Sequence, residues 1–278
     1  MNEDDFVFLA TLLKRCSGLA LDSTRKHLVE SRLTPVAARH GFKTVEALVG
    51  ALAGGHEALT RAVAEAMAVC DSSFFRDREP FVRFRDTMLP SLIAARRSHR
   101  RLRIWCAGCA GGQEPYSLAM MMDGMPALAR WSTDILATDI NEAAIARGRQ
   151  GFYTHDEIMR GLPLETLSRY FQACGNGWRI ASALSDAVKF EAHNLMDSFA
   201  RLGRFDVIFC RNVLLYFDAG CKRDVLKRLC DALAPDGYLV LGAAETVLGL
   251  NEQLEPFGAG GLHMKAAHPP MLRSAAMG

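Results

Sequence analysis

The segment Arg103–Met120, RIWCAGCAGGQEPYSLAM, allows three different interpretations. Cys106 and Cys109 form a C-x-x-C pair, which is typical of zinc sites and redox dithiols. The run Gly108–Gly112 is a glycine-rich bend, which indicates a nucleotide-like ligand. The same letters also describe a strand, a turn and a buried helix with no ligand. Sequence outside the segment distinguishes these possibilities.

Downstream of residue 100, short apolar strands alternate with helical segments. This alternation predicts a mainly parallel α/β sheet. Arg103–Met120 then covers the first strand, the first turn and the start of the first helix of that sheet. The expected strands are Leu102–Ala107, Asp134–Thr138, Val188–Ala192, Asp206–Cys210 and Tyr238–Gly242.

The upstream part of the chain has a different pattern, with apolar residues at helical spacing such as Phe6, Leu9, Leu12 and Leu13. We therefore expect a helical N-terminal domain over residues 1–75 and a linker helix over residues 76–100. An α/β domain follows over residues 101–266. Residues 267–278 are expected to form a disordered tail.

Composition excludes several classes of protein. The 278 residues are half apolar with a net charge of +2, so there is no overall nucleic-acid signature. No apolar run reaches the ~18 residues of a membrane span. The acidic start MNEDDFVF does not fit a signal peptide, and the eight scattered cysteines suit a reducing cytoplasm, where we expect the protein. Charge is uneven, because the run from Arg76 to Arg103 has nine arginines and three acids.

The glycine corner itself argues against a dinucleotide. Its G-x-x-G-G pattern is not G-x-G-x-x-G, and it lacks the Lys-Ser/Thr of a phosphate loop. Pro115 suits the first turn of the following helix. Glu114 then stands where the helix N-terminus would otherwise attract phosphate. An acid at this place favours a ligand that carries positive charge.

Asp139, at the end of the second strand, adds a second carboxylate. An acid at this corner can accept hydrogen bonds from both hydroxyls of an adenosyl ribose. A ligand with an adenosyl ribose, a cationic centre and no phosphate is S-adenosylmethionine. The alternative for Asp139 is a helix N-cap, a role that Asn141 could also fill.

Six blocks along the chain resemble the CheR-type chemotaxis receptor methyltransferases, a family that methylates glutamate side chains of chemoreceptors. The resemblance implies a class I, Rossmann-like methyltransferase domain, a small all-helical N-terminal domain and an inserted antiparallel β-subdomain, here expected over residues 152–192. It covers nearly the whole chain. The blocks are SSFFRD (Ser72–Asp77), AGCAGGQEPYSLAM (Ala107–Met120), ATDINEAAIARGRQGFY (Ala137–Tyr153), HNLMD (His193–Asp197), FDVIFCRNVLLYFD (Phe205–Asp218) and PDGYLVLGAAE (Pro235–Glu245).

The resemblance also implies roles for individual residues. Arg76 and Tyr216 match the pair that faces the reacting groups. Cys70 replaces a common asparagine and Gln113 a usual glutamate, which leaves the cofactor affinity open. The positions that match cofactor-binding residues are Ser72, Arg76, Glu114, Asp139, Asn194, Leu195, Arg211 and Asn212. No metal is implied.

The implied reaction is methyl transfer from S-adenosylmethionine to a glutamate carboxylate, which gives a methyl ester and S-adenosylhomocysteine. A glutamate is ionised at neutral pH, so no general base is needed. The implied partner is the acidic helical bundle of a chemoreceptor, docked through the Arg25, Arg32 and Arg39 face or the basic run from Arg76. The short turn QACGNGW resembles family members that work without a receptor tether. We expect a monomer.

Two other classes compete with this interpretation. A zinc or redox protein would use Cys106 and Cys109, but a second pair of zinc ligands is lacking in the sequence. A non-catalytic module that senses S-adenosylmethionine or S-adenosylhomocysteine would share the cofactor residues. A nucleic-acid methyltransferase is a weaker third, because few aromatics interleave the basic run.

Overall fold

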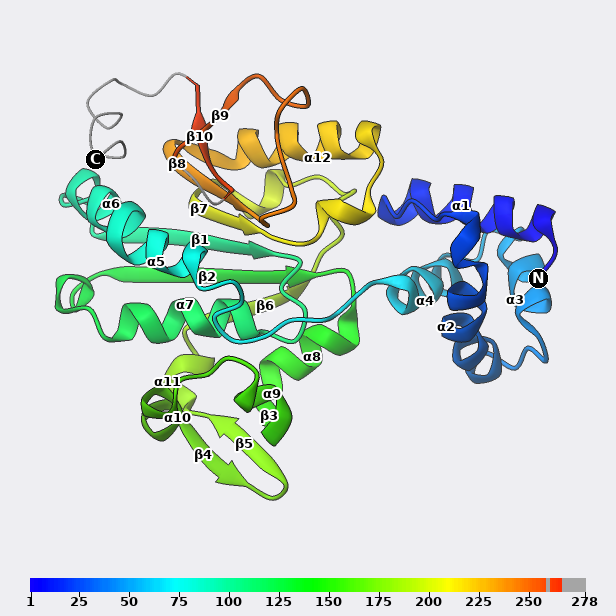
Figure 1. Cartoon of the computed structure of the whole chain (residues 1–278), viewed down its shortest axis with the longest axis horizontal. Coiled ribbons are helices and arrows are strands. Elements are labelled where there is room, and N and C mark those ends of the chain that lie inside the picture. Colours follow the sequence, from blue (N-terminus) through cyan, green and yellow to red (C-terminus); the bar gives the residue numbers. More distant parts are fainter. Residues whose placement is uncertain (259–260, 267–278) are drawn as a thin grey trace.

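A computed structural model of the chain describes residues 1–258 and 261–266 (Figure 1). A bundle of helices, at the right of Figure 1, packs against the edge of a larger α/β part. The tail predicted over residues 267–278 lies outside the described residues.

The helical part has its own hydrophobic core. Asn2 caps the first helix with a reciprocal capping box, and Gly18 ends it with φ 74°. Phe6, Leu9 and Leu13 are buried, as their spacing predicted. The buried residues of this core lie between positions 6 and 67, and Ile140 of the α/β part packs against it. The elements are α1 (Glu3–Ser17), η1 (Ser23–Arg25), α2 (Lys26–Arg39), α3 (Val45–Leu52) and α4 (Glu57–Met67).

A connecting segment follows. It is helical from Glu79 to Ala95, with one π-helical turn in the middle. Phe81, Phe84 and Met88 turn inward against the sheet of the α/β part. The elements are α5 (Glu79–Arg83), η2 (Phe84–Met88) and α6 (Leu89–Ala95).

The large sheet has seven strands in the order β6-β2-β1-β7-β8-β10-β9. The first five are parallel, and each overlaps a strand predicted from the sequence. The last two, β10 and β9, are antiparallel and were not predicted. The strands are β1 (Arg101–Ala107), β2 (Ser132–Asp139), β6 (Val188–Ala192), β7 (Phe205–Cys210), β8 (Leu233–Leu241), β9 (Leu254–Pro256) and β10 (Leu262–Lys265).

Alternate residues of the central strand β1 divide the core in two. Ile104 and Cys106 face the helices of the connecting segment and α7 (Gln113–Asp123). Trp105 faces the other side, under α12 (Ala219–Ala232). This period-two pattern buries both faces of the sheet. The remaining elements on these faces are η3 (Pro126–Leu128), α8 (Glu142–Gln150), α11 (Ser182–Ser185), η4 (Ala200–Leu202) and η5 (Leu214–Tyr216).

A second, antiparallel sheet lies within the stretch 152–192, at the bottom of Figure 1. Its order is β3-β5-β4, and it ends at Ile180. The end of the predicted subdomain differs from this, because Val188–Ala192 is β6 of the large sheet. The elements are β3 (Phe152–Thr154), α9 (His155–Met159), α10 (Leu164–Tyr170), β4 (Phe171–Cys174) and β5 (Gly177–Ile180).

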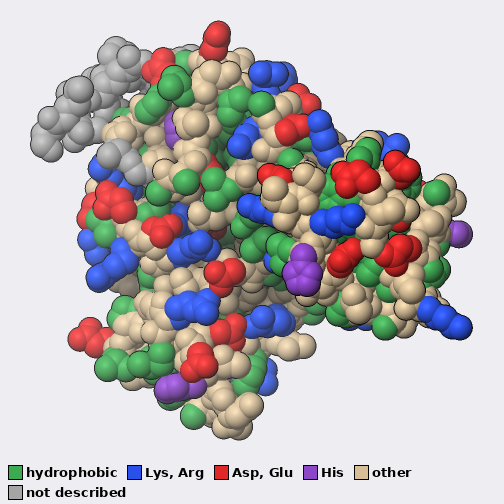
Figure 2. All heavy atoms as spheres, turned by 45° about the vertical axis from the view of Figure 1, so that its right-hand side comes forward, with side chains coloured by type: hydrophobic (Ala, Val, Ile, Leu, Met, Phe, Trp, Pro, Cys, Tyr) green, Lys and Arg blue, Asp and Glu red, His purple; other side chains and the backbone are tan. Residues whose placement is uncertain are grey.

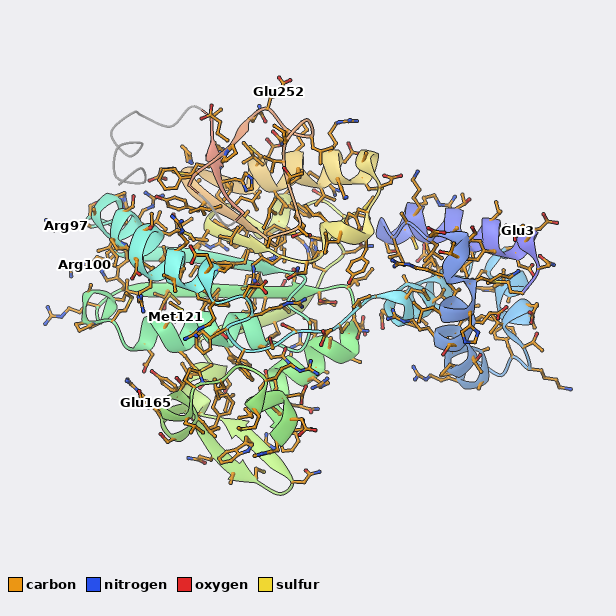
Figure 3. The ribbon with its side chains drawn as sticks, viewed as in Figure 1. Glu3, Arg97, Arg100, Met121, Glu165 and Glu252 are labelled. Atoms are coloured by element: carbon orange, nitrogen blue, oxygen red, sulfur yellow. The ribbon has the colours of Figure 1, made fainter. Side chains whose placement is uncertain are left out.

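On the face drawn in Figure 2, acidic and basic side chains are interspersed. The basic run from Arg76 is divided, since Arg97 and Arg100 lie at the end of the molecule opposite the helical part (Figure 3). On α2, the Arg32 guanidinium donates to the carbonyl of Met67 at 2.8 Å and so is partly committed within the protein. Among the described residues, the structure contains no helix of the length and apolarity that a membrane crossing requires.

Candidate functional site

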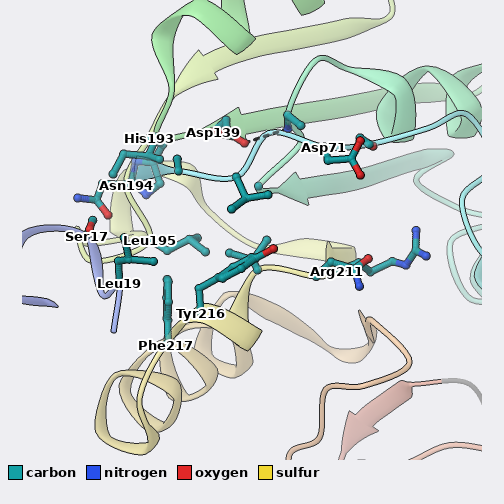
Figure 4. Close-up of a pocket in the computed structure, with 18 of the residues that line it drawn as sticks. Ser17, Leu19, Asp71, Asp139, His193, Asn194, Leu195, Arg211, Tyr216 and Phe217 are labelled. Carbon is teal, nitrogen blue, oxygen red and sulfur yellow. Dashed lines mark hydrogen bonds between the residues drawn. The ribbon is translucent and has the colours of Figure 1, made fainter. Parts of the chain in front are cut away.

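A pocket opens where the carboxyl ends of β1, β2, β6 and β7 meet the helical part (Figure 4). This edge is where parallel α/β sheets bind ligands. The structure brings every predicted site residue to this one pocket: Ser72, Arg76, Glu114, Asp139, Asn194, Leu195, Arg211, Asn212 and Tyr216. The roles assigned to them remain predictions.

The glycine corner forms the floor of the pocket. Gly108 has φ 80° and Gly112 has φ 93°, left-handed values that favour glycine. A Cβ on Gly108 would lie 2.4 Å from Cγ2 of Val213, so the chain crosses this point with no room for a side chain. The bend therefore lets Val213 pack directly against the backbone at Gly108, and both residues line the pocket.

Replacing Gly108 with alanine tests this close approach. Gly41 is a matched control, because it has φ 79° but no atom within 4 Å of an added Cβ. We expect Gly41→Ala to cost about 1–2 kcal/mol for the left-handed backbone. Gly108→Ala should cost about 1–3 kcal/mol more for the clash with Val213. Urea unfolding measures both, and equal losses would contradict the steric argument.

Asp139 ends β2 as a buried carboxylate, 8% exposed. Its Oδ2 accepts from the backbone N–H of Ala110 and its Oδ1 from that of Asn141, both at 2.9 Å. Burial raises the pKa of Asp139, and the backbone hydrogen bonds oppose this shift. Asn141, rather than Asp139, caps α8. Each Asp139 oxygen keeps one acceptor position for a ligand hydroxyl.

Glu114 and Arg211 form a buried ion pair beneath the pocket. Glu114 Oε2 lies 2.9 Å from Nη1 of Arg211, whose side chain is 2% exposed. Burial raises the pKa of Glu114, and the guanidinium opposes that rise. The glutamate is thus not a free anion at the helix N-terminus, contrary to the simple electrostatic argument from sequence. Arg211 in turn binds protein groups with both terminal nitrogens.

Arg211 also holds the loop before α5. Its Nη2 donates to Asp77 Oδ2 at 2.7 Å and to the carbonyl of Arg76 at 2.9 Å. Phe75, Asp77 and Arg78 all have positive φ, between 46° and 65°. Residues seldom adopt this conformation unless their surroundings impose it. The loop is therefore fixed in shape where it forms one wall of the pocket.

The turn after β6 supplies Asn194 and Leu195. The Asn194 carboxamide donates to the carbonyl of Cys16 at 2.6 Å and accepts from the Met196 N–H at 3.0 Å. This side chain shapes the turn and ties it to α1, while Leu195 offers an apolar surface. His193, which was not predicted, also lines the pocket, and burial lowers its pKa.

Asn212 is held in place by a residue to which the sequence analysis gave no role. Asn212 has φ 60°, and its N–H donates to Glu245 Oε2 at 2.9 Å. The same oxygen accepts from the Gly242 N–H at 2.7 Å. Glu245 lies inside one of the six blocks that match the family, so the resemblance could have identified it. Its buried carboxylate fixes the backbone turn at Asn212.

Tyr216 and Arg76 face the pocket from opposite walls. Both are half-buried. The Arg76 guanidinium donates to the carbonyl of Asp71 at 2.9 Å, and the Tyr216 hydroxyl has no partner among the residues that the structure describes. Both groups therefore retain hydrogen-bonding capacity for a ligand.

The helical part closes the pocket. The Ala20 N–H donates to the carbonyl of Tyr216 at 2.8 Å, and Leu19 forms an isolated bridge with Phe217. Lys14 pairs with Asp218, the residue that caps α12. Ser17, Leu19 and Asp71 line the pocket, although sequence reasoning did not assign them to it. Their contribution arises only from the packing of the two parts.

The two cysteines of the C-x-x-C pair are buried and do not reach the protein surface. Cys106 and Cys109 are 0% and 1% exposed, and burial raises the pKa of both thiols well above its usual range. Within the described ranges, no three His, Cys, Asp or Glu side chains come together as a metal site. A thiolate ligand or redox nucleophile is thus disfavoured at these positions.

The lining fits a cationic adenosyl ligand. Three carboxylates, Asp71, Glu114 and Asp139, line the pocket with two guanidiniums, and apolar surface comes from residues such as Leu195 and Val213. Asp139 offers acceptors next to the open glycine backbone. Glu114 is paired with Arg211 and Asp71 with Arg160, so Asp139 is the lining carboxylate without a cationic partner among the described residues. A diphosphate beside Asp139 would be repelled, whereas a sulfonium would not.

Comparisons with known proteins agree with this geometry. Residues 71–260 match the family model described as "CheR methyltransferase, SAM binding domain", and residues 4–67 match "CheR methyltransferase, all-alpha domain". The chain is 39% identical to Chemotaxis protein methyltransferase 1 of Pseudomonas aeruginosa, over 90% of this chain and 93% of that protein. It is 34% identical to a Chemotaxis protein methyltransferase of Vibrio parahaemolyticus, over 92% and 94%.

These matches span both parts of the fold, and the larger one covers the strands and turns that form the pocket. The cofactor is therefore S-adenosylmethionine, and the chemistry is methyl transfer in chemotaxis. The expectations for fold class and cofactor are confirmed. The chain belongs to the CheR methyltransferase family.

Proposed function

We propose that the protein transfers the methyl group of S-adenosylmethionine to glutamate side chains of chemoreceptors and forms glutamyl methyl esters. The observation that carries this proposal is the chemistry of the pocket mouth. A guanidinium, Arg76, and an uncommitted hydroxyl, Tyr216, lie there, while the buried carboxylates of Glu114 and Asp139 are already engaged. This arrangement suits an acceptor that arrives as an anion and needs no base.

Each part of the cofactor would contact a different group of residues. Asp139 would accept the ribose hydroxyls, and Leu195 with the Asn194 backbone would border the adenine. Asn212, Ser72 and Arg76 would border the methionine end, and the buried Arg211–Glu114 pair would support it from below. The cofactor supplies an electrophilic methyl on a positively charged sulfur.

The chain then has three tasks. Arg76 binds the incoming carboxylate by a charge-assisted hydrogen bond. Tyr216 orients one carboxylate oxygen in line with the methyl, which accounts for a large part of the rate in a reaction without acid–base catalysis. The helical part, through Leu19 and Ser17, excludes water that would otherwise solvate the nucleophile.

Tyr216→Phe and Arg76→Ala test this assignment. We expect kcat for methyl transfer to chemoreceptor-containing membranes to fall about tenfold for Tyr216→Phe and about 100-fold for Arg76→Ala. Tritiated S-adenosylmethionine and base-labile methanol release measure the ester. Tyr216→Phe should bind S-adenosylhomocysteine normally by calorimetry. Unchanged rates in both variants would refute the assignment, and a wild-type protein that binds the cofactor without transfer would instead be a sensing module.

The same proposal places the protein in the cytoplasm as a monomer. The β4–β5 hairpin turns at Gly175 with φ 58°, and its strands have only four residues each. We infer from this short hairpin that methylation here proceeds without a tethering peptide at the receptor C-terminus.

A further inference from the structure

We propose that a second groove, separate from the cofactor pocket, binds one face of an acidic amphipathic helix that carries the methylated glutamate. The inference rests on the proposed function and extends it to a substrate-docking surface. The groove runs between the connecting segment, the end of α7 and the α9–α10 region. We call it the methionine groove, after Met120, Met121, Met125 and Met159 in its lining.

The methionine groove has an apolar floor that the protein leaves partly open. Met120 is buried, Met121 and Met125 are half-buried, and Met159 is 56% exposed. Val82, on the opposite wall, is 40% exposed. Figure 3 labels Met121 on α7 and Glu165 on α10, which mark two of its sides. Flexible methionine side chains suit a surface that must accept more than one related apolar helix face.

The rim of the groove is basic. Five arginines and two acids, Asp77 and Glu165, line the groove. Three of the arginines pair with acids just outside the lining, whereas Arg76 and Arg78 have no carboxylate partner among the described residues. Asp77 is already paired with the buried Arg211. An acidic partner would therefore meet attractive charge around an apolar centre. The arginines are Arg76, Arg78, Arg85, Arg160 and Arg169.

Most of these arginines can exchange partners. Arg78 has no side-chain partner in the part of the chain that the structure describes. Arg85 pairs with Asp86 at 2.6 Å, Arg160 with Asp71 at 2.8 Å and Arg169 with Asp123 at 3.2 Å. All six side chains are roughly half exposed or more. Exposed ion pairs of this kind contribute little stability, so a carboxylate on a partner can replace the internal one at small cost.

The groove and the cofactor pocket share a wall. Arg76 lines both, and the strained loop Phe75–Arg78 separates them. This loop is fixed on the sheet side by Arg211 and by the Phe75 N–H, which donates to Ser117 Oγ at 3.0 Å. On the groove side, the Gly161 backbone packs so closely that an added Cβ would lie 2.3 Å from the Phe74 carbonyl oxygen. A helix in the groove would thus place acidic side chains beside Arg76.

The floor favours a protein helix over a nucleic acid. Single-stranded nucleic acids bind to exposed aromatic platforms. Here Phe81 is 3% exposed and so offers no free stacking face, and Phe75 packs edge-on against it. Thioether and aliphatic groups instead match the leucine or alanine face of an amphipathic helix.

The test measures peptide binding without depending on turnover. The probe is a fluorescent synthetic helix of about 20 residues, with leucine and glutamate at helical spacing, added to the full chain with S-adenosylhomocysteine. We expect Arg85→Glu/Arg169→Glu to raise its Kd about tenfold or more, and Met159→Gln to raise it several-fold. Arg223→Glu on α12 and Leu248→Gln are matched controls, since both residues are exposed away from the groove, and should change nothing.

Two further measurements make the outcome decisive. Calorimetry should give the same S-adenosylhomocysteine affinity for all groove variants, which shows that they fold. If Arg25→Glu/Arg39→Glu on α2 abolishes peptide binding while the groove variants retain it, the groove proposal is overturned. Equal effects of Arg85→Glu/Arg169→Glu and Arg223→Glu would overturn it too. Groove-dependent binding in a wild-type protein that never methylates receptors would support the groove and reject the proposed function.

Discussion

Arg211→Met is expected to lower the free energy of unfolding by about 3–5 kcal/mol and to abolish measurable S-adenosylhomocysteine binding. The guanidinium is 2% exposed and binds Glu114, Asp77 and the Arg76 carbonyl at once. Its removal leaves a buried carboxylate without a counter-charge and releases the strained loop that forms one pocket wall. Chemical denaturation and calorimetry measure the two effects.

Two variants separate the local effect from general destabilisation. Arg96→Met removes another partly buried arginine, paired with Asp206 and Asp236 at the opposite edge of the sheet. It should lower stability while leaving cofactor affinity unchanged. Arg211→Met/Glu114→Gln should recover much of the lost stability, because the unpaired charge is gone. A single Arg211→Met variant as stable as wild type would show that the buried pair contributes nothing.

Asp139→Asn is expected to weaken S-adenosylhomocysteine binding by at least about 100-fold. Each carboxylate oxygen now accepts a backbone N–H, from Ala110 and from Asn141. An amide NH2 would face one of these donors instead of accepting from it, and the charge that strengthens bonds to ribose hydroxyls would be lost. Calorimetric titration gives the change in Kd directly.

Asp134→Asn serves as the control for that variant. Asp134 lies near the other end of the same strand and pairs with Arg103 at 3.1 Å, so the substitution is chemically identical but remote from the pocket. Its cofactor affinity should match wild type. If Asp139→Asn also binds normally, the ribose role of Asp139 is wrong and the residue serves only to shape the turn.

The parallel strands could be predicted because each is a buried apolar run followed by a turn signal. β9 and β10 could not, because they are short, and Pro256 and the glycines before Leu262 resemble a loop. β10 becomes a strand by pairing antiparallel to β8, and β9 by pairing antiparallel to β10. Tertiary pairing, which a local pattern does not record, decides their structure.

The pocket residues also separate into those that the local sequence predicts and those that depend on tertiary contacts. Asp139 and the glycine corner were identifiable from chemistry and spacing at the ends of strands. The engagement of Arg211 by Glu114 and Asp77 was not, because these acids lie 97 and 134 positions away in the sequence and meet Arg211 only in the folded chain. Ser17 and Leu19 carried no chemical signal at all and join the pocket through domain packing. The family resemblance assigned a cofactor-binding role to Arg211 but did not indicate which residues its guanidinium binds.

The separate core of the helical part has a kinetic consequence. Its buried residues come from positions 6 to 67, so most of it can form from contacts that are near in sequence, which favours rapid folding. The large sheet must instead join β1 to β7 across about a hundred residues, a slower search. The bonds from Ala20 to Tyr216 and from Asn194 to Cys16 connect the two parts across still longer stretches. We therefore expect the pocket to be completed late in folding, when the two parts dock, and newly made chains to acquire a cofactor site only after that step.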